Sequence, residues 1–162
     1  MKLKLWVLAA LSFALITSTW LMGQNVPGKS KPTPQQERLL LLHMVGRQSG
    51  TQLYQTYLNI GFIADGRAEG TYENKEVEQL LSSVMELLNV LDADLDQISK
   101  LDLSKEDREG VAQVQLIARL LRQQAAQLLV FWKTDDAEDG EKYERTRQEA
   151  WKAISELLKL RS

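Results

Sequence analysis

Two acidic stretches hold most of the side chains that could carry out chemistry. The first contains Asp65, Glu69, Glu73 and Glu76, and the second contains Asp135, Asp136, Glu138, Asp139 and Glu141. Carboxylate oxygens are the ligands that calcium prefers in proteins. The twelve residues from Asp65 to Glu76 begin and end with an acid and have Gly70 in sixth place, as a calcium-binding loop between two helices does. The four acids of the first stretch are therefore candidate metal ligands.

The same stretch also has a simpler interpretation. Arg67 stands in third place, where a calcium loop needs an oxygen ligand. Both acidic stretches lead into a predicted helix, and carboxylates at a helix N-terminus interact favourably with the helix dipole. We therefore expect stabilisation of helix ends to be their main role, and the cation site is the alternative.

A second group of residues predicts a pocket beside the first long helix. Glycine inside a helix costs about 1 kcal/mol relative to alanine, so Gly46 and Gly50 need a physical reason. The missing side chains could leave a pocket with polar-tipped aromatic walls. It would be lined by His43, Gly46, Gly50, Tyr54 and Tyr57. The alternative is close helix packing, in which a large side chain such as Trp132 or Trp151 fills the space.

The residue types that are scarce exclude several classes of function. The sequence has no cysteine, which removes disulfides, thiolate catalysis, Cys-ligated zinc and iron–sulfur clusters. His43 is the only histidine, so sites that need two histidines cannot form within one chain. No nucleophile–base motif or phosphate-binding glycine loop occurs. The net charge of −2 also disfavours nucleic acid as a partner. We therefore predict a non-enzymatic protein without a cofactor.

Four segments show apolar residues every three or four positions, which is typical of helices buried along one side. The first three helices are expected at 34–63, 77–98 and 104–133. The fourth is expected to follow an acidic turn at 134–140. Thr33 and Pro34 are typical of a helix start, because the hydroxyl can cap the helix and proline has a helical φ. Ser104 and Asp107 have the spacing of a capping box.

The connections between these segments are too short to cross a bundle, so consecutive helices should be antiparallel neighbours. Leu80 and Leu87 widen the apolar stripe of the second helix, which favours a bundle core over a two-stranded coiled coil. The predicted fold is all-α, a single antiparallel up-down-up-down four-helix bundle. One end of the bundle should hold the junction with the preceding linker, the turn at 101–103 and the C-terminus. The other end should hold both acidic stretches.

The N-terminus has the features of an export segment. Lys2 and Lys4 precede eighteen uncharged residues, 5–22, in the order that a signal peptide shows. Eighteen residues of helix also reach about 27 Å, close to the thickness of a bilayer core. Residues 1–23 are thus predicted to be a signal peptide or an uncleaved membrane anchor, residues 24–33 a Pro-rich flexible linker, and residues 34–162 the bundle domain.

Two functions follow from this organisation. The first is an exported bundle, periplasmic, secreted or tethered to the membrane through residues 5–22, which acts by contacting another protein or the cell envelope. Its surface is expected to be rich in glutamine: Gln113, Gln115, Gln123, Gln124 and Gln127. The alternative is an extracytoplasmic bundle that binds a small molecule or a cation. The sequence leaves the partner, the ligand and the oligomeric state open.

Overall fold

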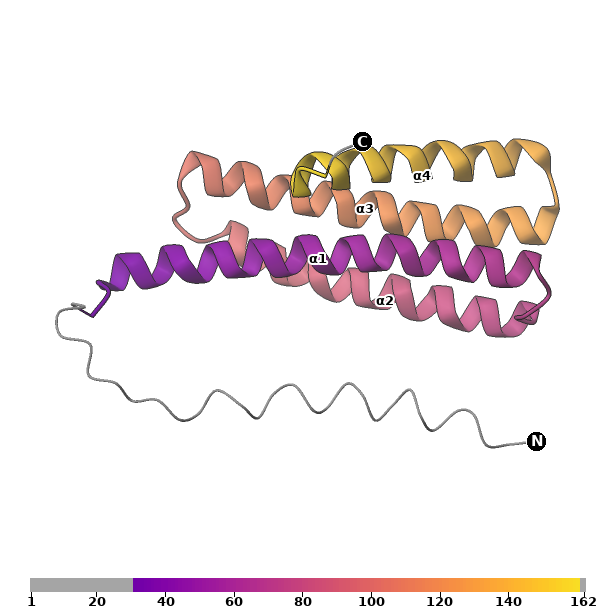
Figure 1. The fold of residues 1–162 in the computed structure, drawn as a ribbon, viewed down its shortest axis with the longest axis horizontal. Coiled ribbons are helices and arrows are strands. Elements are labelled where there is room, and N and C mark those ends of the chain that lie inside the picture. The colour runs from indigo at the N-terminus through magenta and orange to yellow at the C-terminus, as the bar shows by residue number, and fades with distance from the viewer. Residues whose placement is uncertain (1–30, 161–162) are drawn as a thin grey trace, which may run out of the picture. The chain divides into compact units, whose positions relative to one another are not determined.

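A computed structural model gives the fold and describes residues 31–160. Its four helices are α1 (Pro34–Ala68), α2 (Asn74–Ser99), α3 (Lys105–Thr134) and α4 (Ala137–Leu158) (Figure 1). Residues 31–160 contain no strand, so the predicted all-helical fold is confirmed. The predicted export segment, residues 1–23, and residues 24–30 of the predicted linker lie outside the described residues.

Local sequence explains where the helices begin. The Ser104 hydroxyl accepts a hydrogen bond from the backbone N–H of Asp107 at 3.1 Å, which caps α3. Asp136 caps α4 in the same way through the backbone N–H of Glu138, at 2.8 Å. At the start of α2, the Glu76 carboxylate accepts a hydrogen bond from the backbone N–H of Glu73 at 2.9 Å.

Consecutive helices run in opposite directions along the bundle (Figure 1). Helices α1 and α3 each contact the other three helices, whereas α2 and α4 do not contact each other. The cross-section is therefore a rhombus with α1 and α3 on its short diagonal. Its core consists of Leu53, Ile60 and Ile63 from α1, Val77, Leu81, Leu88 and Leu95 from α2, Val114, Ile117, Ala118, Leu121, Ala125 and Leu128 from α3, and Ala150 and Ile154 from α4.

Two expectations about burial are wrong. Leu80 and Leu87 are 39% and 62% exposed, because both lie on the flank of the α2 stripe and outside the core. Gln124 is fully buried instead of contributing to the surface, since it follows Leu121 by three residues and precedes Leu128 by four on the buried side of α3. The connections are also shorter than expected, because α1 continues to Ala68 and α4 already begins at Ala137.

The fourth helix is much shorter than the first. It has 22 residues, compared with 35 in α1 and 30 in α3. Its last turn packs beside Gly50, where a Cβ atom would lie 3.0 Å from Leu158 Cδ2. The chain therefore reaches the end of α4 about halfway along α1, and not at the end of the bundle where α1 starts (Figure 1).

None of the four described helices is long and apolar enough to cross a membrane.

Candidate functional site

The early end of α4 leaves a groove between the starts of α1 and α3. We call this part of the molecule, where α1 begins and α2 connects to α3, the open end. Leu95, Ile98 and Val114 form the apolar floor of the groove, and its volume is about 580 Å³. Because α4 would cover this space if it were longer, the groove is a continuation of the path that α4 follows in the other half of the bundle.

The first four turns of α1 form one wall of the groove. We call residues 34–48 the overhang, because they extend beyond the end of α4. None of the overhang is fully buried, and the first core residue of α1 is Leu53. The overhang nevertheless carries large exposed apolar side chains, with exposed fractions from 42% to 60%. They are Leu39, Leu40, Leu41, Met44 and Val45.

Glycines distinguish the groove from the packed part of the bundle. A Cβ atom added to Gly66 would lie 2.5 Å from the Tyr72 ring, and one added to Gly140 would lie 3.1 Å from the Phe131 ring. These glycines allow close packing within the chain. By contrast, Gly46 and Gly110 line the groove on α1 and α3, and a Cβ atom on either would meet nothing within 4 Å among residues 31–160.

Charged groups of both signs surround the groove. Arg47 and Lys159 lie on the α1 and α4 side, while Glu106 and Asp107 lie on α3. Asp107 also accepts a hydrogen bond from the Ser104 hydroxyl at 2.7 Å. This combination of apolar floor and charged rim is suited to binding an amphipathic segment.

The structure divides the predicted pocket residues among three places. His43 and Gly46 line the groove, whereas Gly50 lies under the last turn of α4. Tyr54 and Tyr57 pack against the Trp151 ring instead, with ring centroids 6.2 Å and 5.5 Å apart. Leu157 and Leu158, rather than a tryptophan, fill the space beside Gly50.

The tyrosine cluster is fixed by an ion pair on α4. Arg147 donates a hydrogen bond to the Tyr57 hydroxyl at 2.9 Å and binds both carboxylate oxygens of Glu144 at 2.6 and 2.7 Å. The hydrogen bonds with Arg147 lower the pKa of Glu144, and they raise the pKa of Arg147 above its usual value. This region is therefore an aromatic and polar contact between α1 and α4.

The first acidic stretch does not form a compact set of ligands. Asp65 lies within α1, and Glu73 and Glu76 are joined in the N-terminal cap of α2. Among residues 31–160, no three acidic or histidine side chains lie close enough together to hold a metal ion. The cap contacts correspond to the expected role in stabilising helix ends.

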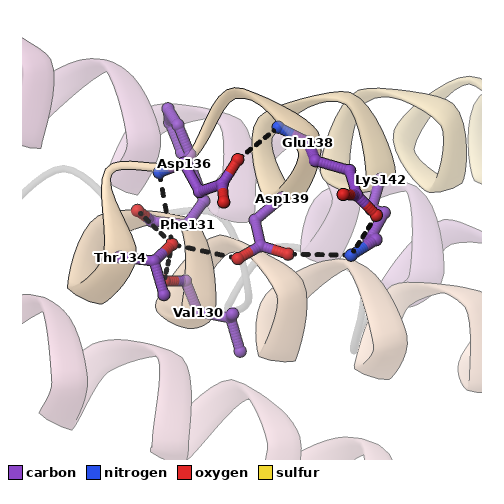
Figure 2. A network of polar contacts seen from close by, with 7 residues as sticks. All are labelled: Val130, Phe131, Thr134, Asp136, Glu138, Asp139 and Lys142. Atoms are coloured by element: carbon purple, nitrogen blue, oxygen red, sulfur yellow. Dashed lines mark hydrogen bonds and ion pairs between the residues drawn. The ribbon is translucent and has the colours of Figure 1, made fainter.

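The second acidic stretch forms a polar network at the turn between α3 and α4 (Figure 2). One Asp139 oxygen lies 3.0 Å from the Thr134 hydroxyl, and the other accepts a hydrogen bond from Lys142 at 3.0 Å. Lys142 also pairs with Glu138 at 3.0 Å. The bond from Lys142, followed by that from Thr134, lowers the pKa of Asp139. Asp139 and Glu138 together raise the pKa of Lys142.

One residue predicted to lie on the surface is a buried polar group. Gln124 is fully buried, and neither polar atom of its amide has a hydrogen-bond partner within residues 31–160. The amide lies close enough to Tyr143 to lower the pKa of that hydroxyl, against the larger raising effect of burial, without reaching hydrogen-bonding geometry. Its position in the apolar stripe of α3 was the signal in the sequence.

Comparison with known proteins finds no matching family model, no matching curated protein and no matching solved structure.

Proposed function

We propose that this protein is an exported, non-enzymatic helical bundle that acts by binding another protein through the groove at its open end. The observation that carries the proposal is the group of exposed apolar side chains on the overhang, beside a groove with an apolar floor. Large exposed apolar side chains gathered in one segment are typical of protein interaction sites. Surface leucines that are scattered singly would carry no such meaning.

The shape of the groove favours a helix as the bound element. Its walls are parallel helices at the spacing that a fourth helix requires, because α4 occupies the same path further along the bundle. A bound amphipathic helix would place apolar side chains at every third or fourth position onto Leu95, Ile98 and Val114. Its polar side would face Arg47 and Glu106 at the rim. The partner helix would thus complete the four-helix bundle.

Export is proposed from the sequence of residues 1–23, with the bundle outside the cytoplasm. Two forms are consistent with that segment: a soluble chain after cleavage near Gln24, and a chain tethered through residues 5–22. Mass spectrometry of the mature protein distinguishes them, since a start at or near Gln24 means cleavage and an intact Met1 or Lys2 means a tether. Recovery of the uncleaved chain from the cytoplasm would contradict export.

Site-specific photo-crosslinking tests the binding function. A photoreactive amino acid is placed at Val45 beside the groove and, as a matched control, at Glu141 in the other half of the bundle. The full chain is expressed in its own host and irradiated. We expect discrete protein adducts from position 45 and none from position 141. Equal labelling from both positions, or no adduct from position 45, contradicts the proposal.

A second candidate function is the binding of an apolar small molecule in the same groove. The volume of about 580 Å³ favours it, because ligand pockets commonly span about 300–1,000 Å³. A fluorescent apolar probe tests it against Gly110→Leu, which fills the groove, and Gly61→Leu, which lies outside it. Probe binding that is lost only in Gly110→Leu supports a ligand pocket. Equal binding by both variants and the wild type removes it.

A further inference from the structure

The two glycines that face the groove point to an occupant with a closely packed backbone. Glycine within a helix is costly, and Gly50, Gly66 and Gly140 each allow a contact within the chain. Gly46 and Gly110 have no such contact, although both lie on walls of the same groove. Gly61 is the other helical glycine with free space among the described residues, and it lies outside the groove. A second helix in the groove could pack its backbone closely against Gly46 and Gly110, as side chains of the same chain pack against the other three glycines.

We propose that this helix is the overhang of a second copy of the same chain, so that two copies form a symmetric dimer. The inference rests on the proposed function, because it names the protein that occupies the same groove. The overhang carries apolar side chains on several sides: Leu39 and Val45 border its own groove, while Leu40 and Met44 are 58% and 59% exposed. One side can therefore rest on its own chain while another contacts the second copy.

The direction of the helices is compatible with a dimer. Helix α4 runs antiparallel to α1, so a helix that continues the path of α4 in the same direction also runs antiparallel to α1. Two overhangs lying side by side in that orientation are related by a two-fold axis perpendicular to them. Each copy then supplies both a groove and an overhang, and the contact closes at two copies without leading to a filament.

The length of the overhang also agrees with the size of stable interfaces. Its 15 residues, 34–48, form a helix about 22 Å long and about 10 Å in diameter. Half of the side surface of such a cylinder is about 350 Å². Two overhangs in two grooves would remove about three times that area from water, because half of each groove is itself overhang. The total of about 1,050 Å² lies at the lower end of specific interfaces.

Charges on the two surfaces are complementary. The overhang carries Arg38 and Arg47 against a single acid, Glu37, while the α3 wall of the groove presents Glu106 and Asp107. The side chains of Arg47 and Glu106 form no hydrogen bond or ion pair within residues 31–160. A second copy would bring the basic overhang against this acidic wall, and such pairing fixes the register of an interface.

Crosslinking between two differently tagged full chains tests the arrangement. The natural chain has no cysteine, so each engineered cysteine is unique. One chain carries Leu40→Cys and the other Gly110→Cys, and a short bismaleimide joins them only if an overhang enters the groove of the other copy. The control replaces Gly110→Cys with Leu87→Cys, which is 62% exposed on α2 outside the groove. We expect the 40–110 product and little or no 40–87 product, whereas equal yields overturn the proposal.

Sedimentation of the purified full chain gives an independent measurement. Gly110→Leu should weaken dimerisation at least about tenfold, as the loss of a central contact does. Gly61→Leu should leave dimerisation unchanged, because it makes the same substitution outside the groove. Thermal melting of each variant checks that it folds. A dimer that is unaffected by Gly110→Leu, or a monomeric wild type, overturns the inference.

The two proposals fail in different ways. If the wild type is monomeric while photo-crosslinking from Val45 captures a different protein, the binding function stands and the second copy is the wrong occupant. If position 45 captures nothing and the chain is monomeric, both proposals are wrong. Capture of the same chain from position 45, together with the 40–110 product, supports both.

Discussion

The two ends of the bundle are built from the same helices but differ in what covers them. At the closed end, where α1 connects to α2 and α3 to α4, four helices surround the core, and Gly66 and Gly140 lie against aromatic rings. At the open end three helices surround the groove, and Gly46 and Gly110 face free space. The cause is the length of α4, which ends beside Gly50.

This difference separates stability from recognition within one small domain. At the closed end the core side chains are buried and the turns are held by caps and ion pairs, so substitutions of these residues should act on the free energy of unfolding. Exposed apolar side chains at the open end contribute little to the stability of a single chain. Their substitution should act on binding instead, and the comparison can be tested by substituting matched residues at the two ends.

The largest expected difference is between two leucines truncated to alanine. Leu81 is fully buried in the closed half, so Leu81→Ala should lower the free energy of unfolding by about 2–5 kcal/mol through lost burial and a cavity. Leu41 is 60% exposed on the overhang, so Leu41→Ala should change stability by no more than about 0.5 kcal/mol. Urea unfolding of dilute protein measures both, and a large loss for Leu41→Ala would mean that the overhang is buried within a single chain.

Glycine substitutions should change stability in opposite directions at the two ends. Gly66→Ala places a Cβ atom 2.5 Å from the Tyr72 ring, and the displacement should cost about 1–3 kcal/mol. Gly46→Ala meets nothing within 4 Å and should stabilise dilute protein by about 1 kcal/mol through higher helix propensity. Gly61→Ala is the control and should behave like Gly46→Ala. Destabilisation by Gly46→Ala would show that the free space at the groove is already filled within the chain.

The sequence predicted the number, order and orientation of the helices, because periodic apolar residues and capping pairs are local signals. The spacing of Ser104 and Asp107 predicted the N-terminal cap of α3, and Ser104 is the residue that caps this helix. The apolar pattern of the predicted helix at 34–63 also indicated burial along its whole length, yet burial begins only at Ser49. Periodicity identifies which side of a helix is apolar. It does not state how far the neighbouring helix extends, and that length decides what is covered.

The candidate site could be predicted only in part for the same reason. His43 and Gly46 were identified as unusual and do line the groove, but Tyr54 and Tyr57 were grouped with them by their positions on one helix. Both tyrosines instead contact Trp151 in the packed half of the bundle, and this residue follows them by almost 100 positions in the sequence. Contacts of this range depend on the register between helices, which the sequence pattern leaves undetermined.

A smaller effect is expected from the unpaired amide in the core. Gln124→Met keeps the length of the side chain and removes two buried polar atoms without partners, so it should stabilise the protein by about 1 kcal/mol. The pKa of Tyr143 should rise further, because the amide now lowers it. Gln79→Met on the exposed side of α2 is the control and should change stability by no more than about 0.5 kcal/mol. A loss of stability in Gln124→Met would show that the amide has a partner in solution.

The smallest effect concerns the polar network at the closed end. The pKa of Asp139 is held below its ordinary value of 3.8 by Lys142 and Thr134, so the folded state favours the ionised carboxylate. This contribution is complete above the unfolded-state pKa and is lost as the pH falls through the lower, folded-state pKa.

Thermal melting from pH 6 down to pH 2 should therefore show a smaller acid-induced loss of stability in Asp139→Asn than in the wild type. Glu141→Gln is the control, because Glu141 is exposed and forms no hydrogen bond or ion pair within the described residues. Its melting profile should follow that of the wild type. If Asp139→Asn also follows the wild type, the Asp139–Lys142 contact does not persist in solution and adds nothing to the stability of the closed end.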